Sequence, residues 1–354
     1  MAGQSRAPHT RPRVTARVET EAVERYRDAV RDAATLPDIG ALADARVCVA
    51  GFTGQVGSAL VRVLTEANWS TLAARPAHIT GIARRARGPA PEGIDAVYAD
   101  VADPNGSFSP HDYTHVFYAV GVTSDYQSRP ADVIASQLVG LQWFLDRVDR
   151  RCRFVFVSSA RVYGRHSVDE ALSEESLAAV TPMHLDNLYD SAKRLAESLC
   201  LWHSEKRGVN ATVLRAGNLY GLDAPQSATS VSELVREAAA TGRITLTGSP
   251  FSLRNYCCVV DFAQGLLRAA TRETPGRAYN IGSTEHLTTQ ELAHAIVGCF
   301  AGPIEIVAPS APPPPSYQRL SLDRARVELG YAPQLRMHDV LPAVVAEIVA
   351  ALPA

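Results

Sequence analysis

Short apolar runs recur along the chain at lengths typical of buried strands. The first is Arg46-Val47-Cys48-Val49-Ala50, and similar runs follow at 78–83, 95–99, 115–120, 153–157, 211–214 and 278–281. Helical patterns separate most of these runs, for example at 57–67 and 131–148. Strands that alternate with helices are typical of a parallel sheet covered on both faces. The pattern therefore predicts an α/β protein built on a doubly wound parallel sheet.

Residues 1–40 precede the first predicted strand, and we interpret them as a leader that is disordered in part. Its second half, from Glu19 to Ala34, mixes charged residues with alanine, as a solvated helix does. Its beginning is polar and carries several arginines without an apolar core, so a secretory signal is not expected. Those arginines also fit an organellar transit peptide, which remains the alternative.

Composition narrows the class of protein. A chain of 354 residues can bury one large domain and a smaller one. Charged residues make up 20% and the net charge is -2, so no nucleic-acid partner is expected. No apolar run approaches the roughly 18 residues of a membrane span. The six cysteines are scattered without metal-ligand spacing, which predicts no metal site, no disulfide framework and a reducing, cytoplasmic location.

A glycine-rich turn follows the first strand directly and reads Gly51-Phe52-Thr53-Gly54-Gln55-Val56-Gly57. Glycines at this spacing permit a tight turn and a close approach of the backbone to a pyrophosphate, and the next helix supplies free N–H groups. The strand–turn–helix context predicts a Rossmann-type dinucleotide site. The residues assigned to it are Gly51, Thr53, Gly54, Gln55, Val56 and Gly57.

The second strand bears on which dinucleotide binds. It ends in Ala83-Arg84-Arg85, and no acidic residue stands between Glu66 and Glu92. An NAD site usually offers an acid to the ribose at this place, whereas arginines suit a 2′-phosphate. We therefore expect NADP, through Arg84 and Arg85, with NAD less favoured and a solvated basic loop as the alternative. Asp100 is assigned to the adenine end of the cofactor, and Val101 and Ala119 to the same site.

A tyrosine and a rare lysine form the candidate catalytic pair. Only two of the 35 basic residues are lysines, and Lys193 stands four residues after Tyr189. Residues four apart share one face of a helix, so the ammonium lies near the phenol. A nearby cation favours phenolate and moves the tyrosine towards acid/base use. This spacing predicts a proton-transfer site.

These motifs and the fifth strand, which ends in Val157-Ser158-Ser159, together resemble the extended short-chain dehydrogenase/reductase family. More narrowly, the chain resembles its nucleotide-sugar epimerase/dehydratase branch, over residues 45–335. The resemblance implies that Ser159 forms a hydrogen bond with the reacting oxygen while Tyr189 donates or removes the proton of that oxygen. It also implies that Lys193 holds the nicotinamide ribose and lowers the pKa of the tyrosine.

The resemblance also assigns the substrate and the domains. Gly217-Asn218 and Arg254-Asn255-Tyr256 resemble the segments that contact the phosphates or sugar of a nucleotide sugar, and Ser124 lies in a polar loop that we expect to face the substrate. The predicted cofactor domain comprises 41–221 and 256–283, and the smaller substrate domain comprises 222–255 and 284–354. Apolar faces on the helices near 131–149 and 189–203 predict a homodimer, as is usual in the family.

Arg161 departs from the pattern of the sugar-nucleotide dehydratases and decarboxylases, which have a glutamate two residues after the catalytic Ser or Thr. Arginine does not deprotonate in proteins, so it cannot be that base. Two reactions stay open: NADPH-dependent reduction of a keto-sugar, which the arginines of the second strand favour, and epimerisation through a transient ketone. A non-catalytic NADP-binding regulator on the same fold is the further alternative.

Overall fold

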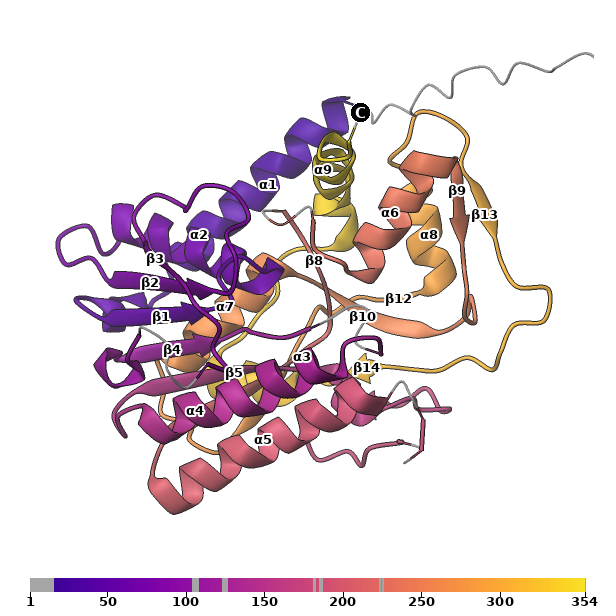
Figure 1. The fold of residues 1–354 in the computed structure, drawn as a ribbon. Helices are drawn as coiled ribbons and strands as arrows, with labels where there is room; N and C mark the ends of the chain where they lie inside the picture. The colour runs from indigo at the N-terminus through magenta and orange to yellow at the C-terminus, as the bar shows by residue number, and fades with distance from the viewer. Residues whose placement is uncertain are drawn as a thin grey trace, which may run out of the picture.

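The structure is a computed structural model that describes residues 16–103, 108–122, 127–180, 183–184, 187–222, 224 and 226–353. Its centre is a sheet of seven strands in the order β11-β7-β5-β4-β1-β2-β3, and all neighbouring pairs are parallel (Figure 1). The strands are β1 (Arg46–Ala50), β2 (His78–Ala83), β3 (Asp95–Tyr98), β4 (His115–Tyr118), β5 (Arg153–Ser159), β7 (Asn210–Ala216) and β11 (Ala278–Ile281). The predicted fold class is confirmed, and each predicted apolar run forms one of these strands.

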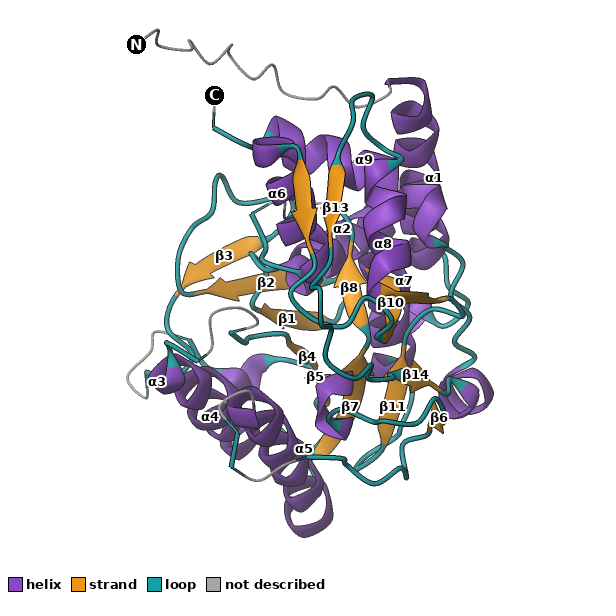
Figure 2. Cartoon of the chain, turned by 90° about the vertical axis from the view of Figure 1, so that its right-hand side faces the viewer, coloured by secondary structure: helices purple, strands orange, loops and turns teal. Residues whose placement is uncertain are grey.

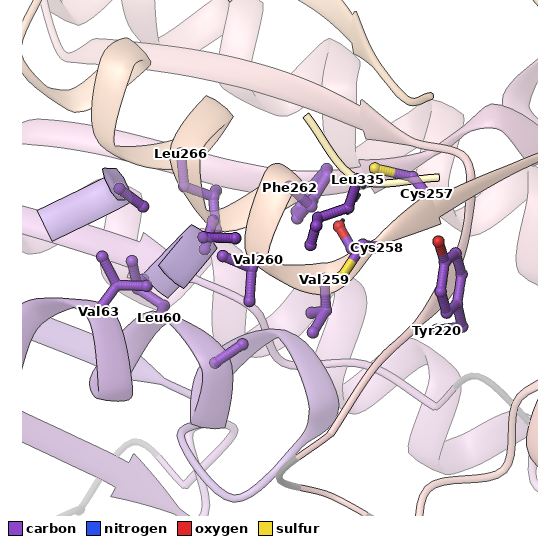
Figure 3. Packing of buried hydrophobic residues seen from close by; sticks show 14 of the residues in the cluster. Leu60, Val63, Tyr220, Cys257, Cys258, Val259, Val260, Phe262, Leu266 and Leu335 are labelled. Atoms are coloured by element: carbon purple, nitrogen blue, oxygen red, sulfur yellow. Dashed lines mark hydrogen bonds between the residues drawn. The ribbon is translucent and has the colours of Figure 1, made fainter. Parts of the chain in front are cut away.

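Successive side chains of each strand enter different cores, which is why the sheet is covered on both faces. Val47 and Val49 of β1 join one apolar cluster, whereas Cys48 and Ala50 join the other. The first cluster lies under α2 (Gln55–Trp69) and α7 (Val259–Ala270), whose packing Figure 3 shows. The second lies under α4 (Gly140–Arg147) and α5 (Asn187–Arg207) (Figure 2). Strands buried on both faces are expected to be apolar, as β1 is from Val47 to Ala50, whereas the edge strand β3 is only partly buried.

The connection from β4 to β5 is one long helical segment with an irregular middle. It begins with α3 (Pro130–Ile134), continues as the π-helical turn η3 (Ala135–Val139) and ends as α4. π-Helical turns are rare and occur frequently at functional sites. This one lies against α5, the helix that carries the predicted catalytic pair.

Smaller elements lie beyond the carboxyl ends of the main strands. A three-stranded sheet has the order β12-β10-β8, and two-stranded sheets pair β13 with β9 and β14 with β6. Their strands and the remaining elements are β6 (Ala171–Leu172), β8 (Asn218–Tyr220), β9 (Arg243–Thr245), β10 (Leu253–Cys258), β12 (His286–Thr288), β13 (Glu305–Val307), β14 (Arg319–Leu320), α6 (Ser230–Thr241), α8 (Thr289–Val297), α9 (Met337–Ala350), and the short turns η1 (Ile39–Leu42), η2 (Pro110–Asp112), η4 (Ala160–Tyr163) and η5 (Ala325–Leu329). The division into two domains stays a prediction, and one apolar cluster joins residues of both parts.

The N-terminal helix α1 (Ala16–Ala34) corrects one expectation. The helix forms where it is predicted, but the prediction that it is solvated is wrong, because Tyr26 is fully buried and Ala29, Val30 and Ala33 join the same core. These positions recur every three or four residues, so they form one apolar stripe. The stripe packs against α2, α7 and α9, and Arg25 forms a 3.1 Å ion pair with Asp339 of α9 (Figure 1).

Two further features concern chemistry and membranes. All six cysteines are free and buried. Across the described residues, no group of His, Cys, Asp or Glu side chains is arranged to hold a metal ion. Within the same residues, no helix combines the length and the apolar character that a membrane span requires.

Candidate active site

The glycine-rich turn lies between β1 and α2, where the order of strands reverses. Gly51 has φ +89°, and a Cβ on it would lie 2.8 Å from the carbonyl oxygen of Ala119 at the end of β4. A Cβ on Gly57 would lie 2.2 Å from the carbonyl oxygen of Gly51. Gly54 is the N-cap of α2, whose first turn contains no acidic residue. Only glycine fits at 51 and 57, and the turn leaves helix N–H groups open to an anion.

The other predicted cofactor residues line the same carboxyl edge of the sheet. Arg84 and Arg85 follow β2 and are exposed, and Asp100 and Val101 follow β3. Arg84 is not isolated, because its Nη1 lies 3.3 Å from Oδ1 of Asp132 at the start of α3. Open parallel sheets bind ligands in the crevice outside their carboxyl ends, at the point of reversal. The donors, the glycine turn and the crevice therefore fit an extended dinucleotide.

The predicted catalytic side chains converge from β5 and α5. Ser159 ends β5, and its Oγ accepts a 3.2 Å bond from the backbone N–H of Arg161. Lys193 is 3% exposed, and its Nζ donates to the carbonyl oxygen of Val157 at 2.6 Å. The same Nζ lies 5.9 Å from the centre of the Tyr189 ring. Burial lowers the pKa of Lys193 to about 7, although Glu197 acts in the opposite direction.

A second cation lies by the tyrosine ring from another element. Cζ of Arg161, in η4, is 5.7 Å from the centre of the Tyr189 ring. Nε of Arg161 donates to Oδ1 of Asp190 at 2.6 Å. Burial raises the pKa of Asp190, while the bond from Arg161 acts against that rise. Two cations from different elements thus lie near the tyrosine ring, one buried and one partly exposed.

Beside the lysine lies a polar side chain with no partner. Gln137, in η3, is fully buried, and neither of its amide atoms has a hydrogen-bond partner among the described residues. A Cβ on Gly121 would lie 3.1 Å from Nε2 of Gln137 and 3.8 Å from Nζ of Lys193. Buried polar groups normally have partners. The amide therefore lies close to Gly121 and Lys193 and is a candidate contact for a bound polar group.

Sequence reasoning missed the carboxylate and arginine behind the lysine. Glu197 accepts a 2.5 Å bond from Oγ of Ser158 and a 2.8 Å bond from Nη2 of Arg215 on β7. Nothing local marks Arg215, which lies 18 residues from Glu197. Glu197 could have been found, because it continues the spacing of four that links Tyr189 to Lys193.

The predicted substrate residues Asn218 and Arg254 stand on neighbouring strands. Asn218 of β8 pairs with Tyr256 of β10, two residues after Arg254. The Arg254 guanidinium donates to two carbonyl oxygens and to Oγ of Ser316, at 2.7 to 2.8 Å, with no carboxylate partner among the described residues. Burial lowers the pKa of Arg254, and the charges of Arg165 and Arg161 lower it further. A half-buried cation near two others suits an anionic ligand. Ser124 lies outside the described residues.

Known proteins resemble this chain over most of its length. UDP-glucuronic acid decarboxylase 6 from Arabidopsis thaliana is 26% identical over 223 residues, which are 61% of this chain and 64% of that protein. A dTDP-glucose 4,6-dehydratase from Streptomyces griseus is 28% identical over 221 residues, which are 60% of this chain and 64% of that protein. In both comparisons the chain spans slightly less than two thirds of the relative's length.

A solved structure shows the same fold. The UDP-glucuronic acid 4-epimerase from Bacillus cereus, in complex with UDP-glucuronic acid and NAD, superposes with a TM-score of 0.70 at 19% identity, over 87% of this chain and all of that one. The sequence profile of the NAD dependent epimerase/dehydratase family matches residues 47–282, well over half of the chain. The resemblance inferred from the motifs is therefore confirmed: this chain belongs to the NAD dependent epimerase/dehydratase family.

Proposed function

We propose that the protein is an NAD(P)-dependent oxidoreductase that acts on a nucleotide-activated sugar. The reaction favoured is reduction of a keto group on the sugar by NADPH. The single observation behind this is that Lys193 lies by the Tyr189 ring and bonds the backbone of Val157, two residues before Ser159. Arg161 stands in the place of the family's glutamate base.

The side chains divide the chemistry between them. Nicotinamide, when bound, supplies or accepts the hydride. Ser159 donates a hydrogen bond to the carbonyl oxygen of the sugar, and Tyr189 delivers the proton that this oxygen needs as it becomes a hydroxyl. The Lys193 ammonium stabilises the phenolate left behind and holds the ribose of the cofactor, with Gln137 as a further donor. Because Ser159 and Tyr189 act at one oxygen and Lys193 supports the phenolate, the set suits a reversible ketone–alcohol conversion.

Elimination is disfavoured by Arg161 and its partner. Removing a proton beside the ketone requires a base, and arginine cannot serve as one. Asp190 is the neighbouring carboxylate, but it is 5% exposed and occupied by Nε of Arg161. We therefore place this chain apart from the decarboxylase and the dehydratase it resembles. Epimerisation, the activity named for the Bacillus cereus structure, needs no such base and is the second candidate.

The substrate proposed is a nucleoside diphosphate sugar. Arg254 offers a half-buried cation with no carboxylate partner among the described residues, and guanidinium suits phosphate oxygens through paired hydrogen bonds. Asn218, on the neighbouring strand, offers its amide oxygen to a sugar hydroxyl, because its Nδ2 donates to the carbonyl oxygen of Asn255 at 3.2 Å and to Oε1 of Gln318 at 3.3 Å. The structure in the comparison holds UDP-glucuronic acid, which has this chemistry.

For the cofactor we propose NADP, with Arg85 as the contact to the 2′-phosphate and Arg84 beside it. The ion pair of Arg84 with Asp132 weakens its share of that contact. NAD in the Bacillus cereus structure makes NAD the alternative. Fluorescence titration with NADPH and NADH decides between them: Arg85→Ala should weaken NADPH far more than NADH, and an equal loss for both would refute the contact with the 2′-phosphate.

The activity itself is tested with a panel of nucleotide sugars and their 4-keto forms, following NADPH absorbance and product mass. Net oxidation of NADPH marks a reductase, and an isomeric product without net redox change marks an epimerase. Dinucleotide binding without turnover of any panel member would favour the regulator.

We also propose a homodimer that forms through α3–α5. Large apolar side chains stand out on these adjacent helices: Ile134 and Val139 are 46% and 49% exposed, and Leu195 and Trp202 are each 51% exposed. Leu195 and Trp202 are seven residues apart, so they share one face of α5. Sedimentation velocity of the wild type and of Trp202→Glu tests this, since a monomer in both would exclude the interface.

A further inference from the structure

The helix with the catalytic pair is fastened to β5 at two points. Nζ of Lys193 donates to the carbonyl oxygen of Val157 at 2.6 Å, and Oγ of Ser158 donates to Oε1 of Glu197 at 2.5 Å. The two contacts lie one helical turn apart on α5 and at successive residues of β5, directly before the predicted catalytic serine. Together they set how far α5 slides and turns on β5, and therefore where Tyr189 stands.

Glu197 is itself fixed by a chain of hydrogen bonds that crosses the sheet. Arg215 of β7 donates to it through Nη2 at 2.8 Å and through Nε at 3.1 and 3.2 Å. Nη1 of Arg215 donates to the hydroxyl of Tyr163 at 2.9 Å, which donates to Oδ1 of Asn280 on β11 at 2.7 Å. The Glu197 and Arg215 side chains are 13% and 14% exposed. A carboxylate held from both sides cannot move without disturbing the end of β5.

A contribution to folding stability does not by itself explain why the Glu197–Arg215 ion pair lies next to Lys193. Apolar residues of similar volume often replace a buried ion pair without loss, or with gain, of stability. Lys193, however, is a cation that is 3% exposed and has no hydrogen bond to a carboxylate among the described residues. A buried ammonium without an anion nearby tends to lose its proton.

The charged and titratable groups around Lys193 come from three elements. Glu197 and Cys200 of α5 favour the protonated ammonium, in that order, against the larger effect of burial. Tyr189 lies on the same helix, and Arg161 of η4 stands by its ring. Arg215 of β7 approaches only through Glu197, and the neighbour from η3 is the uncharged Gln137. Glu197 is thus the group with the charge and the position to support the ammonium.

We propose that Glu197, fixed by Arg215, is a positioning residue for Lys193. Its carboxylate supplies the counter-charge to the ammonium and holds α5 against β5 at the catalytic end of the strand. Its part in turnover rests on the proposed oxidoreductase function, whereas its effect on Lys193 can be measured in the protein without substrate.

The rarity of lysine makes the measurement direct. The chain contains only Lys193 and Lys206, so protein labelled with [ε-13C]lysine gives two lysine signals, and Lys206→Arg assigns them. We expect Lys193 to titrate at a pH lower by roughly one unit in Glu197→Gln than in the wild type. Glu205→Gln, at an exposed position of the same helix, is the matched control and should leave the titration unchanged. An unchanged Lys193 titration in Glu197→Gln would overturn the assignment.

A second variant guards against a failure to fold. Glu197→Leu combined with Arg215→Met replaces the pair by apolar side chains, which a buried site of this kind tolerates. The Lys193 signal should again titrate at lower pH, and the alkaline limb of kcat should move the same way. A wild-type titration in this variant would refute the role of Glu197. If instead the titrations shift as expected but the wild type turns over no nucleotide sugar, only the proposed function fails.

Discussion

Two ion pairs anchor the catalytic helix α5, one to β7 through Arg215 and one to η4 through Arg161, and they differ in burial. We call Glu197–Arg215 the closed pair, because the exposed fraction of each side chain is low, 13% and 14%. Both side chains also form further hydrogen bonds, Glu197 with Ser158 and Arg215 with Tyr163. We call Asp190–Arg161 the open pair, because its carboxylate side chain is 7% exposed but its arginine side chain is 38% exposed. The closed pair stands behind Lys193, and the open pair stands beside Tyr189. The comparison suggests that the closed pair fixes geometry, while the open pair modulates charge where the substrate enters.

The largest effect on turnover should come from replacing Tyr189, whose ring lies near Arg161 of the open pair. Tyr189→Phe removes the proton donor and should lower turnover by about 10²- to 10⁴-fold while leaving dinucleotide affinity nearly unchanged. Steady-state kinetics and NADPH fluorescence give the two readings. In the Tyr189→Phe background, Arg161→Gln and Glu197→Gln should change turnover no further, whereas an additional loss would show that the pairs act independently of the phenol.

Replacing the arginine of each pair should lower the free energy of unfolding by different amounts for the two pairs. Arg215→Met leaves Glu197 charged and buried, and should lower the free energy of unfolding by about 3–5 kcal/mol. Arg161→Met should lower it by only about 1–2 kcal/mol, because this guanidinium is partly solvated. Urea denaturation at pH 7 measures both. Equal losses would mean that the open pair is as enclosed as the closed one in solution.

The buried ammonium of Lys193 should itself lower the free energy of unfolding. Burial lowers the pKa of Lys193 from 10.5 to about 7. Between these values the unfolded chain binds more protons than the folded one, so stability rises with pH across that window. Lys193→Met removes this effect, and its gain over the wild type should be greatest at and below pH 7 and vanish towards pH 10.5. Urea curves at pH 6 and pH 9 check the trend, and a gain that is the same at both would assign the effect to packing.

The smallest effect should come from the open pair. Arg161→Gln removes a cation 5.7 Å from the centre of the Tyr189 ring and should lower kcat by about two- to fivefold. Arg194→Gln, at a neighbouring position of α5, serves as the control. A loss in Arg161→Gln as large as that of Tyr189→Phe would promote Arg161 to a direct role at the substrate.

The sequence predicted the large sheet well because its strands are buried on both faces and therefore appear as uninterrupted apolar runs. The glycine turn and the Tyr189–Lys193 pair were also readable, since their spacing follows from local geometry. The charge content of α1 favours a solvated helix, and only the spacing of Tyr26 and the alanines indicates that one face of it is buried. Arg215 was out of reach, because its bond to Glu197 arises only when β7 is laid beside β5.

The packing of α1 against α9 also has a consequence for how the chain is made. The two helices lie at opposite ends of the sequence and are neighbours in the fold (Figure 1). Roughly 300 residues separate them, so about 15–60 s of synthesis pass before α1 meets this partner. During that time the face around Tyr26 is only partly covered, by the elements already made. The nascent chain therefore exposes part of this apolar face until α9 has been made.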